Sequence, residues 1–127
     1  MEIEVSNGEL LDKYTILQIK KYKIKGDKIN NVLKELKYLK NKVDYLRSKL
    51  DVKIVDDVFL LMAELVLINA RLWDVEDEIR KCEENEDFGE KFISLARQVY
   101  ITNDKRSNIK KQINIISESK FVEEKSY

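Results

Sequence analysis

The sequence contains no proline and no histidine, and its 127 residues include only three glycines and one cysteine. So few turn-forming residues argue against a β-sandwich or barrel, which needs frequent tight turns. Without histidine, the chain lacks the side chain most used as a general base and a metal ligand. The single thiol, Cys82, excludes an internal disulfide and a thiolate metal cluster. We therefore expect a cytoplasmic, all-α protein with no metal and no cofactor.

Long hydrophobic runs are also missing. The most apolar stretch, residues 54–70, is interrupted by charged side chains and is too short to span a bilayer. The N-terminal segment is acidic and has no extended apolar run, so we expect neither a signal peptide nor a membrane association. The chain is therefore predicted to be a single soluble helical domain over residues 1–127, with one modest core.

Charged side chains are abundant but unevenly distributed. Residues 1–53 hold 13 basic and 8 acidic side chains, whereas residues 54–127 hold 11 basic and 16 acidic ones. The two halves are expected to attract each other. The segment 20–53, rich in lysine and tyrosine, is also compatible with nucleic-acid binding. We do not expect nucleic acid as a partner, because a solvated face partly neutralised by the acidic half explains the same composition.

Apolar side chains recur at helical spacing in four segments. The predicted helices cover residues 7–24, 27–50, 55–83 and 87–116. Residues 117–127 lose this periodicity and are expected to form a frayed tail. Ser6 and Glu9 form a capping box before the first helix. Gly26 suits a left-handed residue after that helix, and Asp87 suits the cap of the last one.

The apolar positions also predict how the helices pair. When the third and fourth helices run antiparallel around a short link, each position of one stripe meets a position of the other. Examples are Val58 with Ile113, Asn69 with Thr102, and Glu76 with Leu95. The first two helices pair similarly around Gly26. The prediction is an all-α fold in which two antiparallel hairpins form an elongated four-helix bundle with coiled-coil-like packing.

Several polar residues fall within or beside the apolar stripes, where a charge is costly unless it is paired. Asp12 of the first helix is expected to meet Arg106 of the fourth. The candidate ligand-binding residues are Asp12, Lys13, Glu64, Asn69, Thr102, Asn103 and Arg106. They are compatible with a satisfied network that fixes helix register, or with a pocket for a small anion or polar metabolite. No residue is predicted to be catalytic, and the acids of residues 74–78 are interpreted as a solvated face rather than a Mg²⁺ site.

Three blocks of the sequence carry a resemblance to a known family. They are Glu4–Lys13, Asn69–Asp77, and Thr102–Arg106 with the following Ile109-Lys110. The chain resembles a family of short, uncharacterised proteins from bacteria and their phages, classed as a domain of unknown function. The blocks cover less than half of the chain, although their order and spacing fit most of its length. The resemblance implies a helical fold and supplies no activity.

Two functions from different classes fit these features. The first is a non-enzymatic, oligomeric helical protein that binds another protein or serves as a scaffold. Because the first helix leaves part of the third uncovered, a second copy is expected to cover that part, which predicts a homodimer. The alternative is a binding protein or enzyme for an anionic metabolite or nucleotide, with a polar site inside the bundle. The first is favoured because no catalytic motif is found.

Overall fold

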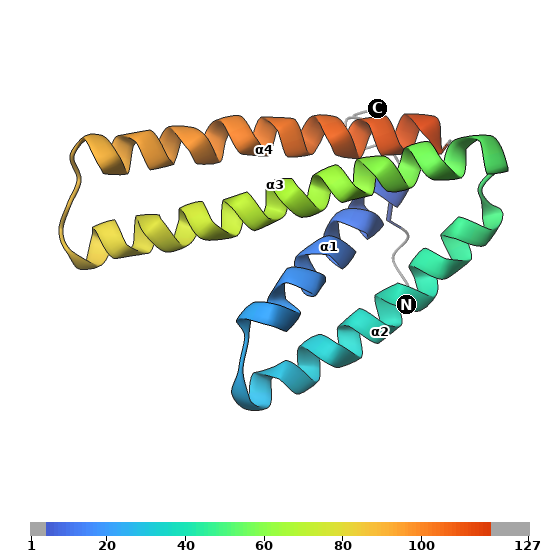
Figure 1. The fold of residues 1–127 in the computed structure, drawn as a ribbon, viewed down its shortest axis with the longest axis horizontal. Helices are drawn as coiled ribbons and strands as arrows, with labels where there is room; N and C mark the ends of the chain where they lie inside the picture. Colours follow the sequence, from blue (N-terminus) through green and yellow to red (C-terminus); the bar gives the residue numbers. More distant parts are fainter. Residues whose placement is uncertain (1–4, 118–127) are drawn as a thin grey trace.

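The structure is a computed structural model that describes residues 5–117. Within that range it contains four α-helices and one short 3-10 turn and no strand (Figure 1). In chain order these are α1 (Asn7–Lys23), the turn Gly26–Lys28, α2 (Ile29–Lys49), α3 (Val52–Glu84) and α4 (Glu90–Ile116). The predicted all-α fold is confirmed. Residues 118–127, most of the predicted tail, lie outside the described residues.

Side-chain caps fix the start of two helices. Ser6 Oγ accepts a hydrogen bond from the Glu9 amide at 3.1 Å, as the capping box predicts. Asp51 Oδ1 accepts from the Lys53 amide at 2.9 Å, which places the start of α3 at Val52 rather than at residue 55. The sequence reasoning overlooked this cap. An aspartate at that position satisfies a helix amide that otherwise has no partner.

The link between α3 and α4 differs from the prediction at Asp87. Glu86 adopts a left-handed conformation with φ of 53°, and the Asp87 amide donates to the Cys82 carbonyl at 2.8 Å. This arrangement closes the C-terminus of a helix. Because Asp87 takes part in ending α3, α4 begins later, at Glu90 with Gly89 as its N-cap.

Two antiparallel hairpins make up the bundle. In the first, α3 and α4 lie side by side along most of their length (Figure 1). Arg71 Nη2 donates to Gln98 Oε1 at 3.1 Å, and Lys91 Nζ lies 3.3 Å from Glu78 Oε2. The hydrogen bond from Lys81, followed in size of effect by the one from Lys91, lowers the pKa of the Glu78 carboxyl below its usual value. In the second hairpin α2 packs on α1. Of these two helices, only α1 makes extensive contact with both α3 and α4.

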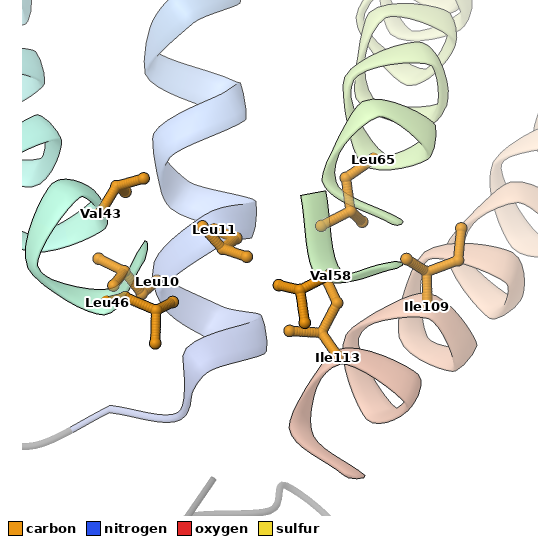
Figure 2. Close-up of a cluster of buried hydrophobic side chains, with 8 residues drawn as sticks. All are labelled: Leu10, Leu11, Val43, Leu46, Val58, Leu65, Ile109 and Ile113. Carbon is orange, nitrogen blue, oxygen red and sulfur yellow. The ribbon is translucent and has the colours of Figure 1, made fainter. Parts of the chain in front are cut away.

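The second hairpin leans away from the first, so the two meet at one end and diverge at the other (Figure 1). The main apolar cluster lies where they meet, and it takes side chains from all four helices (Figure 2). Its buried members are Leu10, Leu11, Val43, Leu46, Val58, Leu65, Ile109 and Ile113. A smaller cluster lies farther along α3 and α4, around Val75, Cys82 and Leu95. The core is therefore divided into two parts.

One predicted pairing position is wrong in the second part of the core. Glu76 was expected in the seam opposite Leu95, but its side chain is exposed and Val75 is buried instead. A carboxylate buried in an apolar seam without a partner is costly, whereas the neighbouring valine gains from burial. Ile79, the next residue of the predicted stripe, still packs on this part of the core.

Candidate functional site

A cluster of polar side chains occupies the gap between the two apolar parts of the core. We call it the Asp12 cluster, and its members are Asp12 and Thr15 from α1, Asn69 from α3, and Arg106 and Lys110 from α4. The helical periodicity that brings Leu11 and Val58 into the core also turns these side chains inward. Three helices thus contribute to one buried polar site.

The Asp12 carboxylate is the centre of this cluster, and the residue is fully buried. Arg106 binds it with two nitrogens: Nε lies 3.0 Å from Oδ1, and Nη2 lies 2.5 Å from Oδ2. This two-point geometry is the strong form of an arginine–carboxylate pair. Since the Arg106 side chain is 28% exposed, the pair lies at the edge of the core, with its anion inside and its cation partly in solvent.

Asn69 attaches α3 to the same carboxylate. Its Nδ2 donates to Asp12 Oδ1 and to Thr15 Oγ1, both at 2.9 Å. Thr15 Oγ1 in turn donates to the Asp12 carbonyl at 2.7 Å. Both amide hydrogens of Asn69 are therefore used in bonds to α1. Thr102, the residue predicted to face Asn69, is also buried.

Lys110 adds a second cation and Glu9 a second anion. Lys110 Nζ lies 2.7 Å from Glu9 Oε2 and 3.7 Å from Asp12 Oδ2. Within residues 5–117, two carboxylates thus meet two cations at this site. Opposite charges matched in this way offset the cost of burying the Asp12 carboxylate.

The start of α1 rests directly on the end of α4, a contact that the sequence reasoning did not identify. The Gly8 amide donates to Asn114 Oδ1 at 2.7 Å, and Asn7 Nδ2 donates to Ser117 Oγ at 2.9 Å. A Cβ atom on Gly8 would lie only 2.5 Å from the Lys110 carbonyl oxygen. A glycine inside a predicted helix was the available signal, because glycine there often marks a close approach of two backbones.

Three of the predicted site residues do not join the Asp12 cluster. Lys13, Glu64 and Asn103 are exposed, and within the described part of the chain none of them contacts its members by a hydrogen bond or ion pair. Each is a sequence neighbour of a buried position, and adjacent residues on a helix point about 100° apart. The structure brings together Asp12, Asn69 and Arg106. Thr102 is buried on α4, four residues before Arg106.

The arrangement holds helices together and leaves little room for chemistry. Each Asp12 carboxylate oxygen already accepts hydrogen bonds, so this group has no open position from which to remove a proton. Asp12 occupies Nε and Nη2 of Arg106, so an incoming carboxylate or phosphate could make the same two-point contact only by displacing Asp12 and leaving a buried anion without its strongest partner. Among residues 5–117, no three carboxylate or thiol side chains gather closely enough to hold a metal ion.

A groove elsewhere on the molecule has a different character. It lies along the hairpin of α1 and α2, with Val66 of α3 at its edge, and has a volume of about 560 Å³. Its apolar and aromatic lining comes from Tyr14, Ile19, Tyr22, Leu33, Leu36 and Val66. Lys21, Lys37 and Lys40 also line it, with Gln18, and among residues 5–117 no carboxylate does. We call this the lysine groove.

The comparisons with known proteins identify a family without an activity. Residues 1–127 match the family described as Family of unknown function (DUF6165). No curated protein and no solved structure matches the chain. In the part of the chain that the structure describes, no helix has the length and apolar character needed to cross a membrane. The chain, matched from its first residue to its last, belongs to this family of unknown function, DUF6165.

Proposed function

We propose that this chain is a non-enzymatic helical protein that acts by binding another protein, and that it does so as a cytoplasmic homodimer. The observation that carries the proposal is the lysine groove, which combines an apolar floor with three lysines and, in the described part of the chain, no carboxylate. A groove of this kind suits the apolar face of an amphipathic helix. Its charge favours a helix that carries acidic residues beside its apolar ones.

The groove leaves large apolar and aromatic side chains exposed to water, which does not stabilise the free protein. Tyr22 is 80% exposed and Leu33 is 42% exposed. The charge of the groove is only partly balanced, since Lys40 pairs with Asp44 at 3.1 Å on the same helix. No ion pair to Lys21 or Lys37 is found within residues 5–117. An acidic helix would bury the apolar surface and pair with these two lysines.

The Asp12 cluster supports the same proposal because it argues against the small-molecule alternative. Its carboxylate and amide are already bonded to groups of this chain. That favours the interpretation in which the cluster fixes helix register over the alternative, a site for an anionic metabolite or nucleotide. Lone buried polar groups that fix register are known from coiled coils.

Binding of an acidic amphipathic helix tests the proposal. The probe is a labelled peptide with leucine along one helical face and glutamate on the others, followed by fluorescence anisotropy. We expect it to bind the wild-type protein and to bind the Lys21→Glu/Lys37→Glu variant about tenfold more weakly, a change of about 1.4 kcal/mol. Loss of attraction and gain of repulsion at two sites account for this change.

Matched variants control for net charge. Lys20→Glu/Lys34→Glu alters the same two helices by the same amount but lies outside the lining of the groove. It should bind the peptide much as the wild-type protein does. Equal weakening by both double variants, or equal binding of a scrambled peptide of the same composition, would contradict a specific site.

The small-molecule alternative has its own test. The protein is heated with nucleotides, sugar phosphates, carboxylates and divalent ions, and the unfolding temperature is recorded. We expect no compound to raise this temperature in a way that depends on Arg106. Stabilisation by one compound that disappears in Arg106→Ala would instead place a ligand at the Asp12 cluster and overturn the proposal, because ligands stabilise only the state that binds them.

A further inference from the structure

The outward side of α4 carries a second stripe of side chains, separate from the one that packs on α3. Apart from the adjacent pair Tyr100 and Ile101 at its centre, its members follow one another at steps of three and four residues, the spacing of a helix seam. They are Glu90, Ile93, Arg97, Tyr100, Ile101, Asp104, Asn108 and Lys111. We call this stripe the outer face of α4. Tyr100 is 70% exposed, Ile93 56% and Ile101 46%.

The outer face of α4 is complementary to a second copy of itself that runs in the opposite direction. A second copy running antiparallel, with a twofold axis between Tyr100 and Ile101, places Tyr100 of each copy against Ile101 of the other. Arg97 then meets Asp104, and Glu90 meets Lys111. Every one of these oppositions occurs twice, because a twofold interface is self-complementary. Only Ile93, opposite Asn108, lacks a matching partner.

The charged side chains of this face form no ion pair with the described part of their own chain. Within residues 5–117 no ion pair is found for Arg97, Asp104, Glu90 or Lys111. Arg97 and Asp104 are both exposed. Charges with this complementary order and no partner among the described residues favour a defined register between two copies.

We propose that two copies of this chain associate through the outer face of α4, antiparallel and centred between Tyr100 and Ile101. This inference rests on the homodimer in the proposed function and adds the surface that forms it. The lysine groove lies on α1, α2 and α3, so it stays open in such a dimer. The uncovered end of α3, where the sequence suggested the contact, is less suitable because Arg80 there already pairs with Asp77 of its own helix.

Charge reversal tests the interface, with the molar mass and dimer dissociation constant measured by sedimentation equilibrium on the full chain. Arg97→Asp and Asp104→Arg should each weaken the dimer about tenfold or more, since each creates two like-charge oppositions. The double variant Arg97→Asp/Asp104→Arg should return close to the wild-type constant, because every pair is restored with its signs exchanged. Lys34→Asp and Glu35→Arg, on the exposed part of α2, should leave the constant unchanged.

A crosslink gives an independent reading. Ile101→Cys places a thiol beside the proposed axis, so oxidation should join two copies in high yield, whereas Leu60→Cys on the exposed part of α3 should not. The native Cys82 is 3% exposed and does not compete. A wild-type dimer that ignores both reversals would refute this surface and leave the homodimer standing. A wild-type chain that stays monomeric at high concentration would refute the homodimer as well.

Discussion

Replacing Asp12 with alanine should lower the free energy of unfolding by about 3 kcal/mol. The substitution leaves the Arg106 guanidinium without the acceptor that joins it to α1, and it removes one of the two bonds from the Asn69 amide to that helix. Removing one partner of a buried ion pair costs about 3–5 kcal/mol. We expect the lower end of that range, because the Arg106 side chain is 28% exposed and regains water. Urea unfolding followed by circular dichroism at the helix band measures the change.

Two further variants separate the pair from its surroundings. Asp44→Ala removes an exposed carboxylate that pairs with Lys40, and it should change stability by less than about 0.5 kcal/mol. Asp12→Leu/Arg106→Met replaces both charges with apolar groups and should recover most of the loss, since no buried charge is then left unpaired and Lys110 keeps its bond to Glu9. A loss below about 1 kcal/mol for Asp12→Ala would show that the Asp12 cluster does not hold α1 in place.

A single methyl group on Gly8 should cost about 2 kcal/mol. In Gly8→Ala the new Cβ would lie 2.5 Å from the Lys110 carbonyl oxygen, which is backbone and cannot rotate away. The start of α1 must then move off α4, which stretches the bonds from Gly8 to Asn114 and from Glu9 to Lys110. Because alanine favours a helix by up to about 1 kcal/mol over glycine, a net loss isolates the steric effect.

Gly89→Ala is the matched control for this prediction. Gly89 precedes α4 with a negative φ, and the nearest atom to its new Cβ would be Asp87 Oδ1 at an ordinary 3.5 Å. We expect its urea midpoint to stay near that of the wild-type protein. If Gly8→Ala were as stable as Gly89→Ala, the close approach of α1 and α4 would be wrong.

Together these contacts explain how the start of α1 is held against α3 and α4. Leu10 and Leu11 enter the main apolar cluster, but they lie within one turn of each other and fix the angle of α1 poorly. The bonds from Asp12 to Arg106 and Asn69 add a second point of attachment, and Gly8 adds a third. A directional polar contact specifies register, whereas apolar contact tolerates small shifts.

The features of the fold that could be predicted are local ones. The Ser6 cap and the left-handed Gly26, with φ of 79°, follow from their own residue types. The hairpin of α3 and α4 follows from two matching stripes around a short link. The start of α4 was misplaced because the same aspartate, Asp87, suits either the end of one helix or the beginning of the next. Only the observed bonds distinguish these two uses.

For the candidate site, periodicity identified inward-facing residues but not their partners. It brought Asp12 toward Arg106, and it also included Lys13, Glu64 and Asn103, which are exposed. Lys110 and Asn114 were overlooked because their contacts depend on how closely α1 approaches α4. The distance between α1 and α4 depends on side chains from both helices, so it cannot be predicted from either segment of the sequence alone.

The amino-acid sequence by itself determined that this protein is helical, where its turns fall, and which helices pair as neighbours along the chain. These properties depend on contacts between residues a few positions apart, which the order of residue types records directly. Only the tertiary structure decided that the hairpins diverge, that the lysine groove opens along α1 and α2 beside α3, and that Asp12 is saturated by its own chain. Those depend on the angle between hairpins, which results from packing at Gly8 and in the main apolar cluster, between segments distant in the chain.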